Sequence, residues 1–276
     1  MTLIEVLKLA SDHLQRHGSE SPRLDAEVLL AHALGLRRLD LYLKFDHTLT
    51  AAELTAYRSL TARRAKGEPV AYLVGHKEFM GLDFEVTPDV LVPNPDTEAL
   101  VQRAVAIARE SERALRVADV GTGSGCIAIA VAHYAGNCEV WATDVSREAL
   151  EVAQRNVARH SLAERVHLSL GDLMEPLRGT FDIVCANLPY VSSTARLALE
   201  VMAQPARALY AEAGGAALIT RLMEDAPARL NPGAHVLAEV DPSILAAVTQ
   251  AARRGFAFQR VHRDLGGHER VLEAWS

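Results

Sequence analysis

A glycine-rich loop between a predicted buried strand and a predicted helix constrains this sequence more than any other feature. The segment VADVGTGSGCIAIAVA places Gly121, Gly123 and Gly125 at the turn. Glycines there let backbone N–H groups at the start of a helix approach a ligand without interference from a Cβ atom. We therefore expect a small polar molecule to lie across this turn. The loop alone is weak evidence, because similar loops also serve to pack a strand closely on a helix.

The chain around and after this loop alternates between strand and helix patterns. Helical stretches separate most of the predicted buried strands, which cover residues 116–120, 139–144, 166–170, 181–187 and 235–240. This alternation predicts an α/β fold with a doubly wound, Rossmann-like parallel sheet. Two short strand-like runs around Gly266 and Gly267 predict an antiparallel hairpin that closes one edge of the sheet.

The first 75 residues have a helical pattern instead. Apolar residues at helical spacing predict one buried stripe, formed by Leu3, Ile4, Leu7 and Leu14. Further helices are expected from an N-cap at Ser21 to Gly35, and from Thr50 to Gly67. We predict a small helical domain at residues 1–75, a hairpin and linker at 76–95, and a larger domain at 96–276.

Charge and cysteine content narrow the classes of function. The 276 residues include 29 basic and 35 acidic side chains, a formal net charge of −6, with no block of like charge. Direct nucleic-acid binding is therefore not favoured. The three cysteines share no metal-ligand spacing, so we expect reduced thiols, no metal site and a cytoplasmic location. The longest apolar run, CIAIAVA, is too short to span a bilayer, and we identify no export signal.

Two acidic residues follow predicted strands at the same edge of the sheet as the loop. Asp144 ends the second strand, where a carboxylate is able to accept both hydroxyls of a ribose, and Asp172 follows the third. Together they predict a nucleoside site. An alternative role for Asp144 is to cap the following helix, although Ser146 fills that role better. An alternative role for Asp172 is a hydrogen bond within a loop turn. Asp119 is expected to order the glycine turn.

The sequence Asn187-Leu188-Pro189-Tyr190 follows the fourth predicted strand. An amide nitrogen attacks a methyl sulfonium poorly because its lone pair is delocalised, unless acceptors hold its hydrogens. The Asn187 side-chain oxygen is able to accept one N–H and the Leu188 carbonyl the other, since Pro189 keeps Leu188 extended. Tyr190 is then expected to stack on the planar group. This motif favours a methyltransferase that uses S-adenosylmethionine.

The sequence closely resembles the HemK/PrmC family of peptide chain release factor N5-glutamine methyltransferases. The resemblance runs nearly end to end, through ESPRLDAEVLL, RRAKGEPVAYLVGHKEF, VPNPDTEALV, VADVGTGSGCIAIA, ATDVSREALEVAQRNV, CANLPY and RDLGGHERVL. It implies methylation of the glutamine in the Gly-Gly-Gln loop of class I release factors, with the N-terminal domain docking the factor. It also implies that S-adenosylmethionine contacts Gly121, Thr122, Gly123, Ser124, Gly125, Asp144, Asp172, Leu173 and Asn187, while Asn187, Leu188, Pro189 and Tyr190 hold the glutamine.

Two positions depart from the family pattern. Leu188 stands where the family usually has a proline; the carbonyl acceptor is retained, but the turn loses rigidity and gains an N–H. If this N–H were buried without a partner it would cost about 1–3 kcal/mol, so we predict that it is bonded or hydrated. Asn94 stands where arginine is usual, which removes a positive charge near the expected substrate entrance, while a helix that begins near Asp96 is still expected to be well capped.

Other functions stay open at this point. A nucleic-acid amino methyltransferase acting on adenine or cytosine solves the same chemical problem with similar motifs, although the net charge of −6 opposes it. A non-catalytic module that binds S-adenosylmethionine is a second alternative, suggested by Leu188 and Asn94. An NAD(P)-dependent oxidoreductase is more distant, because the glycine loop also fits the dinucleotide pattern.

Overall fold

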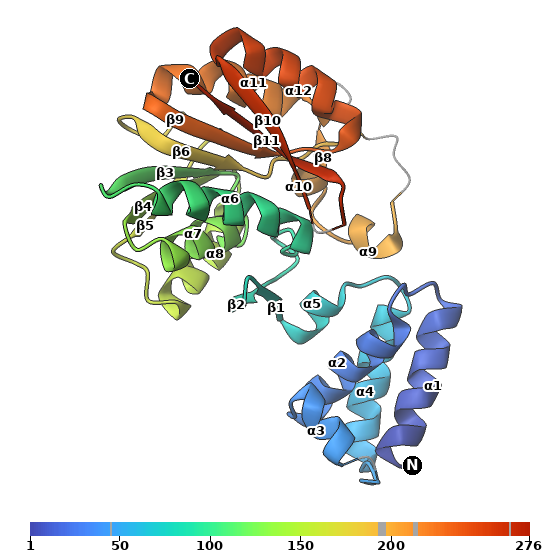
Figure 1. Cartoon of the computed structure of the whole chain (residues 1–276). Helices are drawn as coiled ribbons and strands as arrows, with labels where there is room; N and C mark the ends of the chain where they lie inside the picture. The colour runs from blue at the N-terminus through green and yellow to red at the C-terminus, as the bar shows by residue number, and fades with distance from the viewer. Residues whose placement is uncertain (45, 193–196, 212–214, 265) are drawn as a thin grey trace. The chain divides into compact units, whose positions relative to one another are not determined.

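The computed structural model describes residues 1–44, 46–192, 197–211, 215–264 and 266–276. The chain divides into two compact units, one of Met1–His76 with Leu197–Gln204 and one of Lys77–Arg196 with Pro205–Ser276 (Figure 1). Residues 197–204 thus belong to the N-terminal unit, whereas the sequence-based boundaries assign them to the larger domain.

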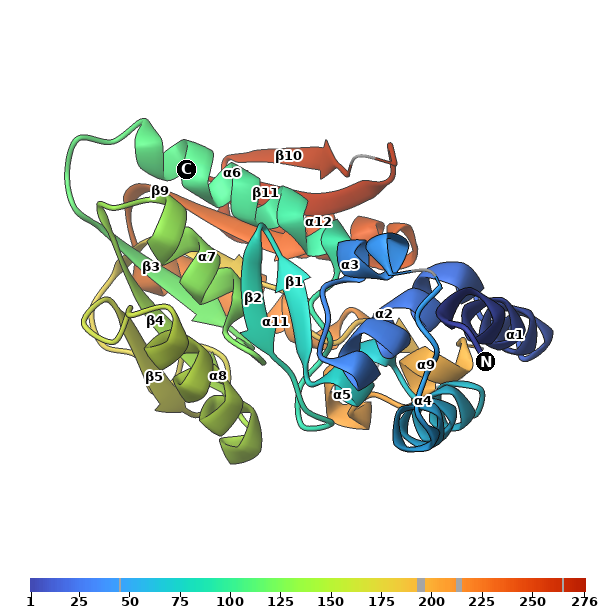
Figure 2. The ribbon, with the colours of Figure 1, turned by 90° about the horizontal axis from the view of Figure 1, so that it is seen from below.

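The N-terminal unit is helical, as predicted. Its helices are α1 (Leu3–Arg16), α2 (Pro22–Leu34), α3 (Arg38–Leu43), α4 (Ala51–Arg64), α5 (Val70–Val74) and α9 (Leu199–Met202). Leu3, Leu7 and Leu14 of α1 are buried in a core with residues of α2 and α4. These three helices pack against one another (Figure 2). The prediction for Ile4 is wrong, because its side chain is 52% exposed. Consecutive residues of an α-helix are rotated by about 100° around its axis, so Ile4 points away from the buried stripe to which Leu3 belongs.

The ends of these helices follow the local sequence. Ser21 is the N-cap of α2, although its side chain makes no capping bond, and Gly35 ends the helix in the left-handed conformation. Thr50 caps α4 in a reciprocal pair with Glu53. Helix α4 ends at Arg64, slightly before the predicted end at Gly67.

A hairpin of β1 (His76–Phe79) and β2 (Leu82–Glu85) comes before the main sheet, as predicted. Phe79 and Phe84 are buried and meet edge to face, with ring centroids 6.2 Å apart. The Asn156 side chain of α8 (Arg147–Arg159) bonds both backbone groups of Glu85, which fixes the hairpin to that helix.

The main sheet has seven strands in the order β10-β11-β9-β6-β3-β4-β5. The strands are β3 (Leu115–Val120), β4 (Cys138–Asp144), β5 (Val166–Leu170), β6 (Phe181–Ala186), β9 (Leu230–Glu239), β10 (Phe258–Arg263) and β11 (Glu269–Trp275). The first five pair in parallel, and β11 pairs antiparallel with β9 and β10. The predicted sheet and its edge hairpin are confirmed.

Strand β9 begins earlier than predicted. Its first residues, LNPGA, contain a proline and a glycine, which argue against a strand. The register explains how they are accommodated, because Phe181 pairs with Leu230 but Ile183 pairs with His235. The intervening residues of β9 therefore form an irregular, unpaired stretch.

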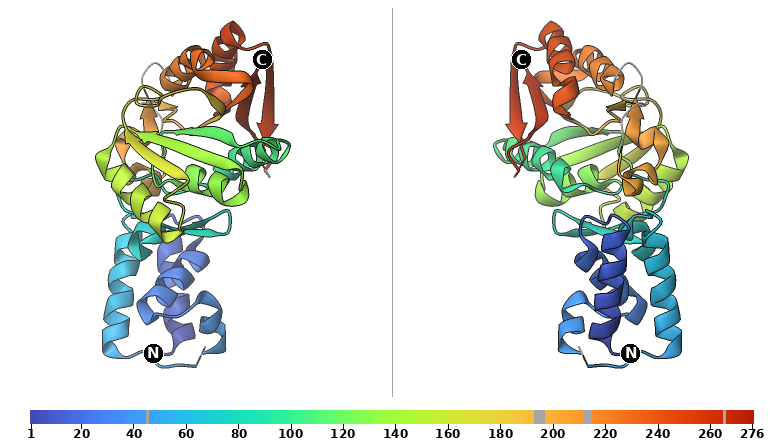
Figure 3. Two further views of the ribbon diagram at one scale, coloured as in Figure 1. Left: turned by 90° about the vertical axis from the view of Figure 1, so that its left-hand side faces the viewer. Right: turned by 90° about the vertical axis from the view of Figure 1, so that its right-hand side faces the viewer.

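Helices cover both faces of the sheet (Figure 3). Helices α6 (Glu98–Arg109), α7 (Cys126–Tyr134) and α8 share one hydrophobic core with one face, and α11 (Ala217–Asp225) and α12 (Pro242–Gly255) share another core with the opposite face. The short elements are η1 (Pro95–Thr97), β7 (Val191–Ser192), α10 (Ala206–Leu209), β8 (Tyr210–Ala211) and η3 (Ala226–Arg229). In the described ranges, none of the helices has the length and apolar character needed to cross a bilayer.

Candidate active site

A pocket lies at the carboxyl ends of β3, β4 and β6, where the predicted site residues meet. Of those residues it is lined by Gly121, Thr122, Gly123, Ser124, Asp144, Asp172, Leu173, Asn187, Leu188 and Pro189. Gly125 and Tyr190 are not part of its lining. The carboxyl ends of parallel strands share one edge of the sheet, which is why segments distant in sequence converge here.

The glycines of the loop differ in what they allow. Gly121, Gly123 and Gly125 all have positive φ, between 53° and 82°, which other residues adopt only with strain. A Cβ atom on Gly121 would lie 2.8 Å from the Leu188 side chain. A Cβ atom on Gly125 would lie 3.3 Å from Ala153 of α8, so this glycine serves helix packing. The first two glycines shape the pocket, and the third joins α7 to α8.

Asp119 orders the loop, as expected. Its Oδ2 accepts hydrogen bonds from the Thr122 hydroxyl at 2.6 Å and from the Ala128 N–H at 3.1 Å. The side chain is fully buried, and Oδ1 has no partner among the described residues. Burial raises the pKa of Asp119 to about 7, against the hydrogen bonds that lower it.

Asp144 bonds the glycine loop and the next turn. Its Oδ2 accepts from the Gly123 N–H and its Oδ1 from the Ser146 N–H, both at 2.9 Å. A carboxylate offers about four acceptor positions, so about two stay available for ribose hydroxyls. Ser146 is the N-cap of α8 and accepts from the Ala149 N–H, which confirms that the cap belongs to Ser146.

Asp172 and Leu173 form the third side of the pocket. Asp172 is paired through Oδ1 with Arg221 of α11, which leaves Oδ2 for another donor. Leu173 has a positive φ of 44°, unusual for a residue with a Cβ atom, and its carbonyl accepts from the Thr143 hydroxyl at 2.8 Å. This bond holds the strained turn at the mouth of the pocket.

Asn187 lies one residue beyond β6 with its side chain anchored. Its Nδ2 donates to the Thr97 hydroxyl at 3.0 Å. Neither the Asn187 Oδ1 nor the Leu188 carbonyl receives a hydrogen bond from the residues that the structure describes. Two acceptors on adjacent residues are therefore available at the pocket, as the proposed clamp requires.

The Leu188 side chain has a role that the sequence does not reveal. It is 5% exposed and packs in the core with α11 and α12, with Cδ2 against the backbone of Gly121. It thus joins the motif to the glycine loop through packing. No acceptor for the Leu188 N–H is found in the described ranges, so the prediction that this group is bonded or hydrated now depends on water.

Tyr190 is partly buried and packs against the core that α11 and α12 share with the sheet. Its hydroxyl donates to Oε1 of Glu239 at 3.3 Å, and burial raises the pKa of the phenol. A Cβ atom on Gly215 would lie 2.0 Å from the Tyr190 carbonyl oxygen, so only glycine fits there. These contacts hold the end of the motif in place, and the stacking role of Tyr190 stays a prediction.

The segment before α6 contributes further lining. Asn94 caps η1 by accepting from the Asp96 N–H at 3.1 Å, which confirms the expected capping. Glu98 accepts from the Met80 N–H and so holds the hairpin turn. Lining residues that the sequence did not indicate are Asp89, Val90, Leu91, Val92, Pro93, Val145, Arg207, Ala208 and Leu218. Val92, Pro93 and Val145 belong to the quoted VPNPDTEALV and ATDVSREALEVAQRNV segments but were not assigned to the site, and most of the others lie in irregular or short segments.

Comparison with known proteins agrees with this geometry. Residues 5–75 match the model of the PrmC N-terminal domain, and residues 96–232 match that of the methyltransferase small domain. The chain is 40% identical to the release factor glutamine methyltransferase of Rhodopirellula baltica, covering 98% of this chain and 95% of the relative. It is also 40% identical to that of Moorella thermoacetica, covering 100% and 99%.

A solved structure supports the fold alone. A methyltransferase from Pyrococcus furiosus superposes with a TM-score of 0.54 and 23% identity, covering 78% of this chain and 97% of that one. The full-length relatives and the two domain models confirm the resemblance that the motifs indicate. The chain belongs to the family of release factor glutamine methyltransferases.

Proposed function

We propose that the protein transfers a methyl group from S-adenosylmethionine to the side-chain amide nitrogen of the glutamine in the Gly-Gly-Gln loop of class I peptide chain release factors. The observation that carries this proposal is the pair of unengaged acceptors, Oδ1 of Asn187 and the Leu188 carbonyl, beside the glycine-loop pocket. A primary amide has two N–H groups, and two acceptors fix its plane and its nitrogen.

The pocket fits the cofactor. Asp144 has acceptor positions left for ribose hydroxyls, and Gly121 and Gly123 leave the loop open to a close approach. Among the described residues that line the pocket there is no lysine, and Arg207 is the one basic residue, which suits a cofactor without phosphates better than a dinucleotide. When bound, S-adenosylmethionine supplies an electrophilic methyl group on a positively charged sulfur.

The chain's own groups act by orientation. Oδ1 of Asn187 accepts one amide hydrogen of the glutamine and the Leu188 carbonyl accepts the other. The nitrogen lone pair is thereby directed at the methyl carbon. The nitrogen would take the methyl group that bound S-adenosylmethionine supplies and would release one proton, and S-adenosylhomocysteine would be the second product. Positioning of this kind lowers a barrier by up to about 7–11 kcal/mol in favourable cases.

We assign docking of the release factor to the N-terminal helical unit. Its helix α3 presents Leu39 and Leu43 with 66% and 74% exposure, next to the exposed Tyr42. Apolar side chains gathered at the surface are typical of protein–protein contacts. The cytoplasmic location expected from the cysteines stays a prediction.

The test combines a substrate change with an enzyme change. The protein is incubated with labelled S-adenosylmethionine and a release factor that bears Gly-Gly-Gln or a replaced glutamine, with RNA and DNA as further substrates. Label should enter the factor only when the glutamine is present, and Asn187→Ala should abolish it. Asn231→Ala, at the opposite edge of the sheet, is the matched control and should keep the activity of its folded fraction.

Three outcomes contradict the proposal. Label that persists after the glutamine is replaced excludes that nitrogen as the acceptor. Label in nucleic acid, lost at moderate salt, favours the amino methyltransferase alternative. Cofactor binding without transfer to any release factor favours a binding module.

A further inference from the structure

A second layer of polar residues lies behind the Asn187 amide. The Asn187 side chain donates to Thr97, at the end of η1, and Thr97 is 2% exposed. The Thr97 hydroxyl also lies beside the carboxyl of Glu239, the last residue of β9, and as a donor it lowers the pKa of that carboxyl. Glu239 also accepts from the Tyr190 hydroxyl at 3.3 Å. Both ends of the Asn187-to-Tyr190 motif thus lead to one carboxyl, through Thr97 at the Asn187 end and directly at Tyr190.

Glu239 is an unusual residue to bury at this position. It is 1% exposed, and its Oε2 has no partner among the described residues. It lies on the face of the sheet that α6 covers, and the charged or titratable groups near it are Asp96, Arg270, Cys126 and Tyr190. Arg270 is already paired with Asp96 at 3.0 Å and with Asp264 at 3.1 Å. A carboxyl kept buried without a full set of donors lowers stability, which favours a functional reason for keeping it.

We propose that Thr97 and Glu239 are positioning residues for the methyl transfer: the Thr97 hydroxyl fixes the Asn187 amide so that Oδ1 faces the substrate, and Glu239 fixes the Thr97 hydroxyl. This inference rests on the proposed function. The Asn187 amide has two orientations related by a half turn, and they exchange its acceptor for a donor. Only an acceptor at Thr97 selects the orientation that directs Oδ1 away from Thr97.

The protonation state of Glu239 decides what Thr97 offers. A hydroxyl has one hydrogen and two lone pairs. When Glu239 is ionised, the Thr97 hydrogen is held by the carboxylate and a lone pair is left for Asn187. When Glu239 is protonated, its own O–H is able to donate to Thr97 and competes with the Asn187 N–H. Burial raises the pKa of Glu239 to about 7. Transfer should therefore increase as the pH rises from about 6 to 8.

The first test replaces Thr97 in the full-length protein and measures kcat on a release factor bearing Gly-Gly-Gln, with S-adenosylmethionine affinity measured separately. Thr97→Val keeps the shape and removes the acceptor, and should lower kcat about tenfold, the effect of one lost hydrogen bond. Cofactor affinity should change less than about twofold, since Asp144 and the glycine loop are untouched. Thr97→Ser keeps the hydroxyl and should restore the rate. Thr249→Val on α12 is the matched control for the substitution itself.

The second test is the pH profile of kcat at saturating substrates. Glu239→Gln should have low activity throughout and no rise between about pH 6 and 8, because glutamine presents donors as the protonated acid does. Thr97→Ser should keep the rise of the unmodified protein. Asp119→Asn should also keep it, which separates Glu239 from the other buried carboxyl with a similar pKa.

The results separate the two proposals. A Thr97→Val rate equal to that of the unmodified protein overturns the positioning role while leaving the proposed function intact. If kcat of Glu239→Gln still rises between about pH 6 and 8, the positioning role of Glu239 is overturned and the proposed function is left intact. Absence of transfer by the unmodified protein overturns both. Urea denaturation of each variant shows that the fold is kept, and a variant that unfolds is replaced in the comparison by Thr97→Ser and the pH profile of the unmodified protein.

Discussion

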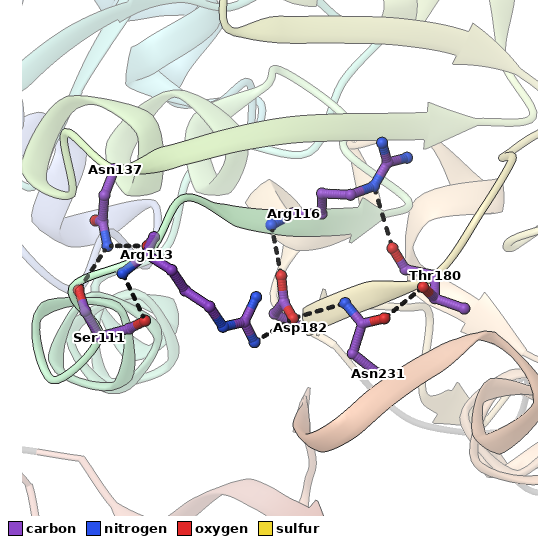
Figure 4. A network of polar contacts seen from close by, with 7 residues as sticks. All are labelled: Ser111, Arg113, Arg116, Asn137, Thr180, Asp182 and Asn231. Atoms are coloured by element: carbon purple, nitrogen blue, oxygen red, sulfur yellow. Dashed lines mark hydrogen bonds and ion pairs between the residues drawn. The ribbon is translucent and has the colours of Figure 1, made fainter.

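At the amino ends of the parallel strands the Asp182 carboxylate is surrounded by donors, whereas at the carboxyl ends Asp119 and Glu239 are not. Asp182, at the start of β6, accepts from the Arg113 guanidinium, the Arg116 N–H and the Asn231 amide, at 2.7–2.8 Å (Figure 4). Asp119 and Glu239 each keep one oxygen without a partner in the described part of the chain. All three residues are at most 5% exposed.

The pKa values follow from this difference. Burial alone would raise the pKa of Asp182, but bonds from Arg113, Arg116 and Asn231 hold it below its usual value. Burial raises the pKa of Asp119 and of Glu239 to about 7, because their donors are too few to offset it. The amino edge therefore stabilises the fold, while the carboxyl edge keeps groups that cost stability where the pocket lies.

Glu273 on β11 is, like Asp182, a buried carboxylate whose oxygens are paired with donors. Both of its oxygens accept from Arg103 of α6, and they also bond His235 and His262. The side chain is fully buried, and although burial opposes ionisation, these bonds hold its pKa well below the usual range. A satisfied buried carboxylate thus joins β9, β10, β11 and α6.

The largest effect is expected for Glu273→Gln. The variant leaves the Arg103 charge without its partner inside the protein, and the free energy of unfolding should fall by about 3–5 kcal/mol. Urea denaturation at pH 7.5 measures this. Glu269→Gln in the same strand, whose partner Arg263 is largely exposed, should change stability by less than about 1 kcal/mol. Equal effects of the two variants would show that the buried cluster contributes no more than a surface pair.

A smaller loss is expected for Asp182→Ala at the amino edge. Arg113 is 60% exposed and is able to turn to water, so we expect a loss of about 2–3 kcal/mol, mainly from the Arg116 and Asn231 donors. Methyl transfer per folded molecule should stay unchanged. A loss of kcat comparable to that of Glu239→Gln would contradict the division between a stabilising edge and a functional edge.

The next effect is a change in the pH dependence of stability, expected for Asp119→Asn. With a pKa of about 7 when folded and about 4 when unfolded, Asp119 binds more protons in the folded state between these values. Stability therefore falls as the pH rises through this window. The variant should reduce the fall between pH 5 and 7.5 by about 2–2.5 kcal/mol, measured by urea denaturation at both values. Asp182→Asn should leave this difference unchanged, and a fall that persists in Asp119→Asn would exclude Asp119 as its source.

Most of the fold was predictable because local patterns agree with the tertiary structure. Buried strands, the glycine turn and the helix ends at Gly35 and Thr50 all have local signals, and the topology of parallel strands brings Asp144 and Asn187 to one edge. The irregular start of β9 was not predictable, because its proline and glycine are accommodated by a neighbouring strand. The exposure of Ile4 depends on a single helical rotation.

The site was predictable where a motif carries it and not where packing does. The motif identifies Asn187, but its partner Thr97 lies 90 residues away in sequence and is found only in the folded chain. Glu239 has no sequence signal beyond an acid at the end of a strand. Leu188 is the clearest case, because the sequence shows only a missing proline, while the structure shows a buried side chain against Gly121.

The smallest effect is expected for Leu188→Pro, which restores the residue usual in the family. Proline removes an N–H for which no acceptor is found in the described ranges, and it biases Asn187 toward the extended conformation. It also removes apolar contacts of a side chain that is 5% exposed. Removing the N–H stabilises the fold and losing the apolar contacts destabilises it, so the free energy of unfolding should change by less than about 1 kcal/mol. Leu188→Ala loses the contacts but keeps the N–H, and should lower the free energy of unfolding by about 2–3 kcal/mol.

The same Leu188→Pro variant should have little effect on the reaction. Because the carbonyl acceptor is kept, kcat on the release factor should stay within about threefold. A tenfold loss would mean that the leucine side chain, through Gly121, sets the direction of that carbonyl, and the carboxyl edge would then depend on packing as much as on hydrogen bonds.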